Sequence, residues 1–68
     1  MSLSARNHLH GTIEEINVDT ILCHVVVRVG SDLIESVITR RSAEEMGLKK
    51  GDQVAAVVKA TEVMISKP

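Results

Sequence analysis

The sequence predicts an all-β domain, a small five-stranded Greek-key barrel of the OB type with one short helix between its third and fourth strands. Runs of residues alternate apolar and polar side chains with the two-residue period of a strand. Turn-forming residues separate most of these runs, and the segment after the third run carries the start and stop signals of a helix. The order of three strands, a helix and two strands is that of an OB-type barrel.

The first two expected strands span residues 7–16 and 21–29, joined by a turn at residues 17–20. The first strand is apolar on one face and polar on the other. Gly11 within it predicts a bend or a close approach of another backbone. The second strand is apolar on one face and half apolar on the other, so we expect it to be covered on part of both faces, as at a subunit interface.

A third strand is expected over residues 33–39 and a short helix over residues 42–47. Ser42 and Glu45 have the spacing of a capping box, in which the hydroxyl and the carboxylate each accept a backbone N–H at the helix start. Gly47 provides the left-handed conformation that ends a helix. The pattern therefore predicts both ends of this helix.

Two further strands are expected over residues 53–59 and 63–65, with a break in the pattern at residues 60–62. The chain contains no linker and no low-complexity segment. Residues 1–68 are therefore expected to form a single domain.

The chain of 68 residues is too short to be very stable by itself. A domain of this size buries only about 60% of the surface that its unfolded chain exposes. Its single cysteine, Cys23, excludes an intrachain disulfide, and the paired cysteines typical of structural zinc sites are missing. Cys23 is expected in the core, and oligomerisation is expected to complete that core.

Composition excludes several classes of function. The chain has no aromatic residue and a net charge of −1, which argues against a nucleic-acid-binding module. No stretch approaches the roughly 18 apolar residues of a membrane span. The lone cysteine and the lack of a signal peptide favour the cytoplasm. No catalytic constellation is present, so we expect no enzyme activity.

Hydrogen-bond donors gather where the expected strands end. A hydroxyl and a guanidinium precede the first strand, hydroxyls lie at the end of the third strand and at the helix start, and an ammonium ends the fourth. These residues are Ser4, Arg6, Thr39, Ser42, Lys59 and Thr61. Such a set of donors favours an anion whose oxygens are all acceptors. Molybdate, tungstate and sulfate fit this description, whereas a protonated phosphate also needs an acceptor.

The same positions resemble the molbindins, the small Mop-type molybdate-binding proteins. The module also occurs in molybdate-responsive regulators and in the TOBE regions of molybdate-transport ATPases. The resemblance covers essentially the whole chain. It rests on Ser4-Ala5-Arg6-Asn7 followed by Gly11, on Ile38-Thr39 with Ser42 and Gly47-Leu48, and on Lys59-Ala60-Thr61-Glu62-Val63-Met64-Ile65.

This resemblance implies an OB-like barrel assembled as a hexamer, a trimer of dimers, with oxyanions bound between subunits. Carried over by position, the oxyanion-binding candidates are Ser4, Arg6, Thr39, Ser42, Lys59, Ala60 and Thr61, with Ala5 and Asn7 contributing backbone or side-chain amides. The implied function is reversible binding of molybdate or tungstate for intracellular storage or homeostasis, without a catalytic cofactor. The alternative is a regulatory or protein-interaction module of the TOBE type, with vestigial or accessory anion binding.

Three histidines fall outside the family pattern. His8 and His10 share one face of the first expected strand. We expect them to be solvated or at an interface, and a metal site is the alternative; no direct metal ligand is assigned. Cys23 and His24 are adjacent and therefore point to opposite faces of their strand, so they cannot form a nucleophile–base pair by themselves.

Overall fold

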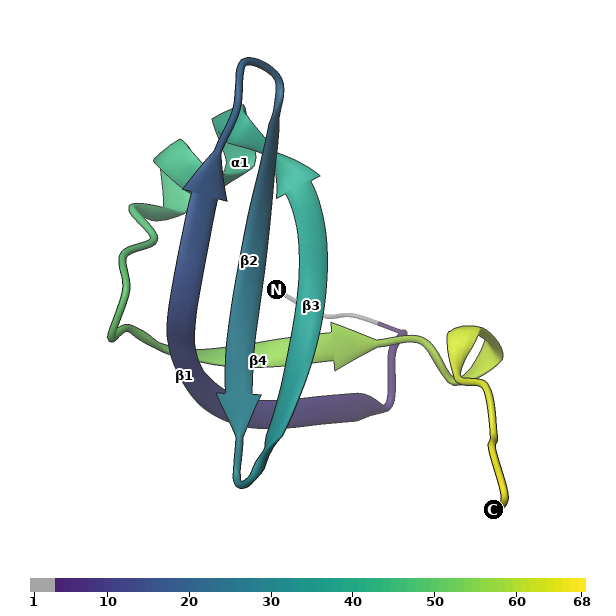
Figure 1. The fold of residues 1–68 in the computed structure, drawn as a ribbon. Coiled ribbons are helices and arrows are strands. Elements are labelled where there is room, and N and C mark those ends of the chain that lie inside the picture. The colour runs from purple at the N-terminus through teal and green to yellow at the C-terminus, as the bar shows by residue number, and fades with distance from the viewer. Residues whose placement is uncertain (1–3) are drawn as a thin grey trace.

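The computed structural model describes residues 4–68 as a four-stranded antiparallel sheet with one α-helix and one turn of 3-10 helix (Figure 1). In chain order the elements are β1 (Asn7–Val18), β2 (Leu22–Val29), β3 (Asp32–Thr39), α1 (Arg40–Met46), β4 (Gln53–Val58) and η1 (Ala60–Glu62). The predicted sequence of three strands, a helix and a fourth strand is confirmed.

The sheet has the strand order β3-β2-β1-β4, which is a Greek-key arrangement because β4 returns through α1 to lie beside β1. The first half of β1 pairs with β4, from Asn7 opposite Val58 onward, and its second half pairs with β2. A bulge between Ile13 and Glu15 interrupts the second ladder and adds to the bend of β1 (Figure 1). The sheet thus curls without closing.

Gly11 lies in this bent strand where β2 comes close. A Cβ atom at Gly11 would overlap the backbone carbonyl oxygen of Arg28 and would lie 2.9 Å from Cγ1 of Val27 and 3.0 Å from Cγ2 of Val29. Only a residue without a side chain permits this approach. The expected bend or close backbone approach at Gly11 is confirmed.

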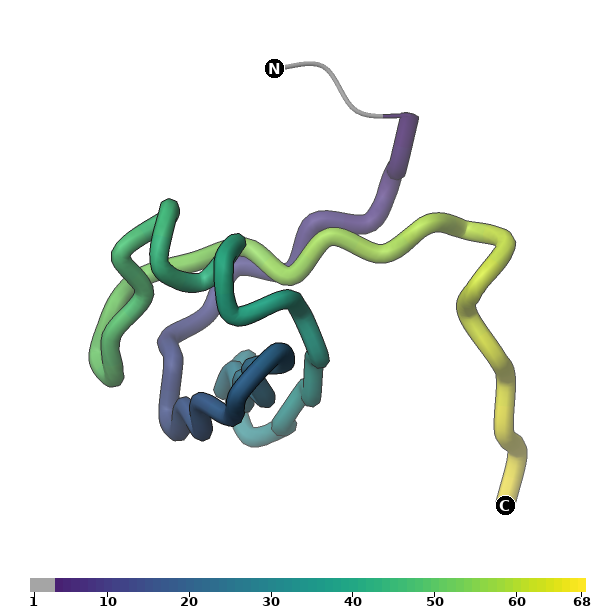
Figure 2. The backbone as a smooth tube through the Cα atoms, turned by 90° about the horizontal axis from the view of Figure 1, so that it is seen from above, coloured from purple at the N-terminus to yellow at the C-terminus, as the bar shows by residue number. Residues whose placement is uncertain are grey.

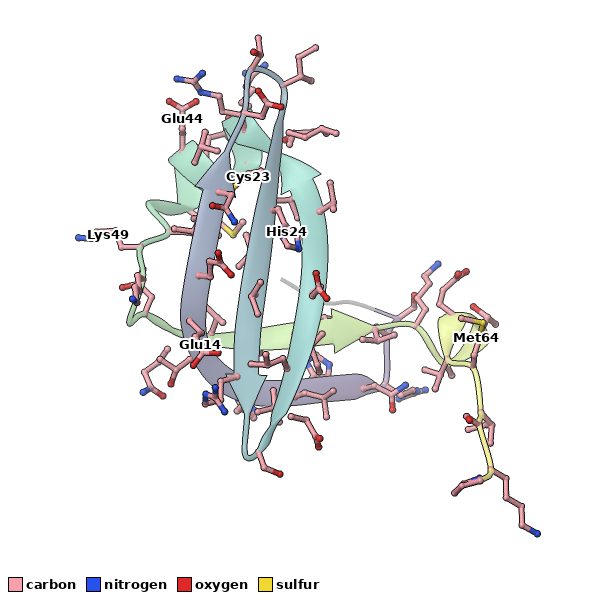
Figure 3. The ribbon with its side chains drawn as sticks, in the orientation of Figure 1. Glu14, Cys23, His24, Glu44, Lys49 and Met64 are labelled. Atoms are coloured by element: carbon pink, nitrogen blue, oxygen red, sulfur yellow. The ribbon has the colours of Figure 1, made fainter. Side chains whose placement is uncertain are left out.

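The core lies on the inner face of the curled sheet, under α1. Its buried members are Ile13, Cys23, Val25, Val27 and Ala43, and the partly buried side chains packed on them are Ile16, Val29, Ile38, Leu48 and Val54. The side chain of Cys23 is 0% exposed, so its predicted place in the core is confirmed (Figure 3). Val26 is buried on the opposite face. The sequence prediction that β2 is covered on part of both faces is therefore correct.

Helix α1 ends as predicted but begins earlier. Gly47 has φ 62° and ψ 38°, the left-handed conformation of a C-cap, and the N–H of Leu48 donates to the carbonyl of Ala43 at 3.1 Å. At the other end the cap is Thr39, whose Oγ1 accepts the backbone N–H of Ser42 at 3.1 Å.

The predicted capping box of Ser42 and Glu45 is therefore wrong. Ser42 lies inside the helix, and the carboxylate of Glu45 pairs with Arg41 at 3.1 Å. The prediction named only Ser42 as the cap, whereas Thr39 stands three residues before it. The end of β3 makes Thr39 the cap, because Thr39 still pairs with Leu22 of β2 and is therefore the last extended residue.

The predicted fifth strand over residues 63–65 is not a strand in this structure. After η1 the chain runs away from the sheet (Figures 1 and 2). Met64, which projects from this tail (Figure 3), is 93% exposed, and Ile65 is 89% exposed. A strand requires a neighbouring strand to accept its backbone hydrogen bonds, and the tail has no such neighbour among residues 4–68.

Strands β3 and β4 are consequently the two edges of an unclosed sheet. An apolar groove of about 310 Å³ runs along its inner side, lined by residues that include Ile34, Ile38, Met46, Leu48, Val54 and Ala56. Within residues 4–68, no helix combines the length and the apolar composition that crossing a bilayer requires.

Candidate oxyanion-binding site

The residues just before β1 and just after β4 lie at one end of the β1–β4 ribbon. The pair formed by Asn7 and Val58 is the last of this antiparallel ladder. The chain therefore enters β1 and leaves β4 at the same place, on the side of the molecule remote from α1 (Figures 1 and 2). The structure thus places the predicted site residues Ser4, Ala5, Arg6 and Asn7 and the predicted site residues Lys59, Ala60 and Thr61 at the same end of the ribbon, on either side of the Asn7–Val58 pair.

This end of the ribbon carries two positive charges, on Arg6 and Lys59. Arg6 and Lys59 are both exposed. Neither takes part in an ion pair with any residue of the described range 4–68. Two cationic side chains with free donors create a local positive potential, which favours an anion.

Hydrogen bonds hold the backbone at this end in both segments, the one that follows β4 and the one that precedes β1. Lys59 is extended, with φ −68° and ψ 139°, and caps η1. The N–H of Glu62 donates to the carbonyl of Lys59 at 2.9 Å. In the segment before β1, the backbone carbonyl oxygen of Ala5 lies 3.2 Å from Nε2 of His8. The turn of η1 exposes Thr61 and also places the carboxylate of Glu62 nearby.

The predicted site residues Thr39 and Ser42 lie at a different end of the molecule, where β3 meets α1 (Figure 1). The Oγ1 of Thr39 accepts the N–H of Ser42, and the two hydroxyl oxygens are 2.9 Å apart. Whichever hydroxyl donates across that distance, the hydrogen of the other hydroxyl remains free. One O–H donor is therefore available here, as an anion contact requires.

Within one chain, then, the predicted site is in two parts. The curl of the sheet carries the start of α1 away from the end of the β1–β4 ribbon (Figure 1). The sequence indicated every one of these residues but could not indicate this separation, because it depends on the register and bend of β1. The parts can meet only if two copies of the chain contribute to one site.

The start of α1 also carries two arginines that the sequence analysis did not assign. Arg40 and Arg41 form ion pairs with Glu44 at 3.3 Å and with Glu45 at 3.1 Å, one turn further along the helix. Positive charges in a first helical turn oppose the helix dipole. The two arginines add N–H donors beside Thr39 and Ser42. Their position in the sequence, directly after the third strand, could have indicated them as site candidates.

Comparison with known proteins places the chain in a family. Residues 3–65 match the TOBE domain. The chain is 42% identical over 66 residues to molybdenum-pterin-binding protein 1 of Clostridium pasteurianum, covering 96% of this chain and 97% of that protein. It also superposes on MopII of the same organism with a TM-score of 0.89 at 40% identity, covering 97% of this chain and 100% of that one.

A second solved structure, a molybdate-binding protein from Sporomusa ovata, superposes with a TM-score of 0.92 at 36% identity, covering 98% of this chain and 100% of that one. Both the sequence match and the two superpositions extend over almost the full length of the chain. The resemblance predicted from the sequence is confirmed: the chain belongs to the TOBE domain family, among the small molybdenum-pterin-binding proteins.

Proposed function

We propose that this protein binds molybdate reversibly in the cytoplasm, for storage or homeostasis of the oxyanion, and performs no chemistry on it. The observation that carries this proposal is the pair of unpartnered cations, Arg6 and Lys59, at one end of the β1–β4 ribbon. The relatives named for molybdate or molybdenum binding support it. The buried lone cysteine is compatible with a reducing compartment.

The donor set explains the class of ligand, a fully deprotonated tetrahedral oxyanion. Arg6 supplies charge and a rigid fork of N–H donors, and Lys59 supplies a second charge. The free hydroxyl of the Thr39–Ser42 pair and the exposed hydroxyl of Thr61 add directional donors. A fully deprotonated tetrahedral dianion accepts at every oxygen, so molybdate and tungstate both fit this set.

The complete site lies between copies of the chain. One copy contributes the end of the β1–β4 ribbon and another contributes the start of α1 with Thr39 and Ser42, because these two parts are separated within one copy (Figure 1). A hexamer built as a trimer of dimers supplies such interfaces. A ligand that bridges chains then stabilises the assembly as well as the fold.

Assembly also explains the open sheet and the exposed tail. Residues 63–65 are apolar and exposed, and the inner groove between the free edges of β3 and β4 is apolar and open. We place the tail of a neighbouring copy along one of these edges as the fifth strand, which closes the barrel and buries Met64 and Ile65.

Thermal-shift measurements test the binding proposal. Molybdate and tungstate should raise the midpoint of unfolding, because a ligand that binds only the folded state stabilises it, by about 2.7 kcal/mol at 100 times its dissociation constant. Sulfate should have a smaller effect and phosphate the smallest. Equal shifts for all four anions would contradict selectivity, and no shift with any of them would favour the regulatory-module alternative.

Native mass spectrometry tests the role of the tail. The wild-type protein should appear as a hexamer, whereas Met64→Asp should appear as smaller species, because a carboxylate cannot be buried in an apolar groove without a large cost. The matched control is Ser66→Asp, which adds the same charge two residues further along the same exposed tail. An unchanged hexamer for Met64→Asp would show that the tail is not part of the interface.

A further inference from the structure

Two histidines project from the outer face of β1 at its N-terminal end. His8 and His10 are two residues apart in an extended strand, so their side chains share one face. Both are exposed. This face is opposite to the one on which Ile13 enters the core. Their cross-strand neighbours in β4 are Val57 and Ala55, which offer neither charge nor a competing hydrogen bond.

We propose that His8 and His10 form a chelating site for a borderline divalent cation such as Zn²⁺, Ni²⁺ or Cu²⁺. The proposal is independent of the oxyanion site. Same-face residues of a strand are about 6.6–6.8 Å apart along the chain. Two imidazole rings that lean toward each other across this spacing can reach one ion at the usual distance of about 2.0–2.1 Å. Imidazole nitrogens suit these three metals.

A hydrogen bond to His8 prepares one of the ligand atoms. Nε2 of His8 lies 3.2 Å from the backbone carbonyl oxygen of Ala5. A carbonyl oxygen can only accept, so Nε2 carries the hydrogen and the lone pair of Nδ1 remains available. Metal-binding histidines are generally held in this way, with the second ring nitrogen donating to a carbonyl or a carboxylate.

The protein supplies two ligands from each chain. Among residues 4–68 there is no cluster of three or more histidine, cysteine, aspartate or glutamate side chains placed to share an ion. Neither His8 nor His10 has an ion-pair partner in that range. Water, or the same histidine pair of a second copy, therefore completes the coordination.

Isothermal titration of the full chain with zinc chloride, in the absence of any oxyanion, tests the site. Saturable binding with no more than one ion per chain is expected. His8→Ala and His10→Ala should each weaken it at least tenfold, since loss of a mere outer-shell partner already costs about 10- to 100-fold. Both positions are exposed, and circular dichroism should show that both variants fold. No saturable binding, or unchanged binding by both variants, would overturn the proposal.

His24→Ala is the matched control. His24 is also a surface histidine, on β2, but its Nε2 is 2.8 Å from the Glu35 carboxylate and no second histidine shares its face (Figure 3). The His24→Ala variant should bind zinc as tightly as the wild type does. A loss of zinc affinity equal to that of His8→Ala would overturn the assignment. Nitrogen chemical shifts of the rings add a second readout. Without metal His8 should be the Nε2–H tautomer, and zinc should shift its Nδ1.

Discussion

Replacing Arg6 with alanine is expected to weaken molybdate binding by about 10- to 100-fold while leaving the fold intact. A hydrogen bond to a charged group contributes about 1.5–3 kcal/mol, and each 1.4 kcal/mol is a factor of ten in affinity. Arg6 is exposed and has no ion-pair partner in the described range, so its removal should not change the unfolding midpoint of the ligand-free protein. Isothermal titration with molybdate measures the loss.

Two further variants make this test specific. Arg28→Ala removes an arginine of equal charge, which pairs with Glu14 on the outer face of the sheet at 2.6 Å. Such a surface pair contributes only about 0–1 kcal/mol to the stability of the fold. Molybdate binding should therefore persist in this variant. Arg6→Lys keeps the charge but loses the planar fork, so its affinity should fall between those of the wild type and Arg6→Ala. If Arg6→Ala binds molybdate as tightly as the wild type, the site is centred elsewhere.

Replacing Gly11 with alanine is expected to be the most destabilising small substitution in the strands. The added methyl group would meet a backbone oxygen, that of Arg28, as well as the side chains of Val27 and Val29. Side chains can rotate away, but the carbonyl can move only if β1 and β2 separate. Overpacking typically costs about 1–3 kcal/mol, and we expect the upper end of that range.

Thermal unfolding measures this effect. For a domain of this size each kcal/mol lowers the midpoint by about 4–8 °C, so Gly11→Ala should lower it by about 10–20 °C. Gly30→Ala is the matched control: Gly30 has a φ of 61° but no atom within 4 Å of the added Cβ. It carries only the conformational cost of about 1–2 kcal/mol. A smaller loss for Gly11→Ala than for Gly30→Ala would show that β1 and β2 are not tightly apposed.

The local features of the fold could be predicted because each depends on neighbouring residues. Alternation along β2 distinguished its core face, with Cys23, from the face that carries His24. Gly47 marked the end of α1 because a left-handed residue is needed there. Gly11 marked the close backbone approach because an interior glycine in an otherwise regular strand has few other uses.

The predictions that were wrong concern features that depend on segments distant in the sequence. The helix begins at Arg40 and not at Ser42 because Thr39, which pairs with Leu22, is the last extended residue before it. Residues 63–65 have a strand pattern but are not a strand, because a strand exists only beside a partner and no strand within residues 4–68 pairs with the tail.

The sequence by itself determined the mostly β class of the fold, the place of Cys23 in the core and the family, and it indicated the charged and hydroxyl-bearing residues that we propose as oxyanion ligands. Only the tertiary structure decided how those donors are grouped. Through the register of β1 and β4 it places Arg6 and Lys59 at the same end of the β1–β4 ribbon, and it leaves Thr39 and Ser42 at another end of the curled sheet. Local pattern specifies which way a side chain faces, whereas register and bend specify which distant side chain it meets.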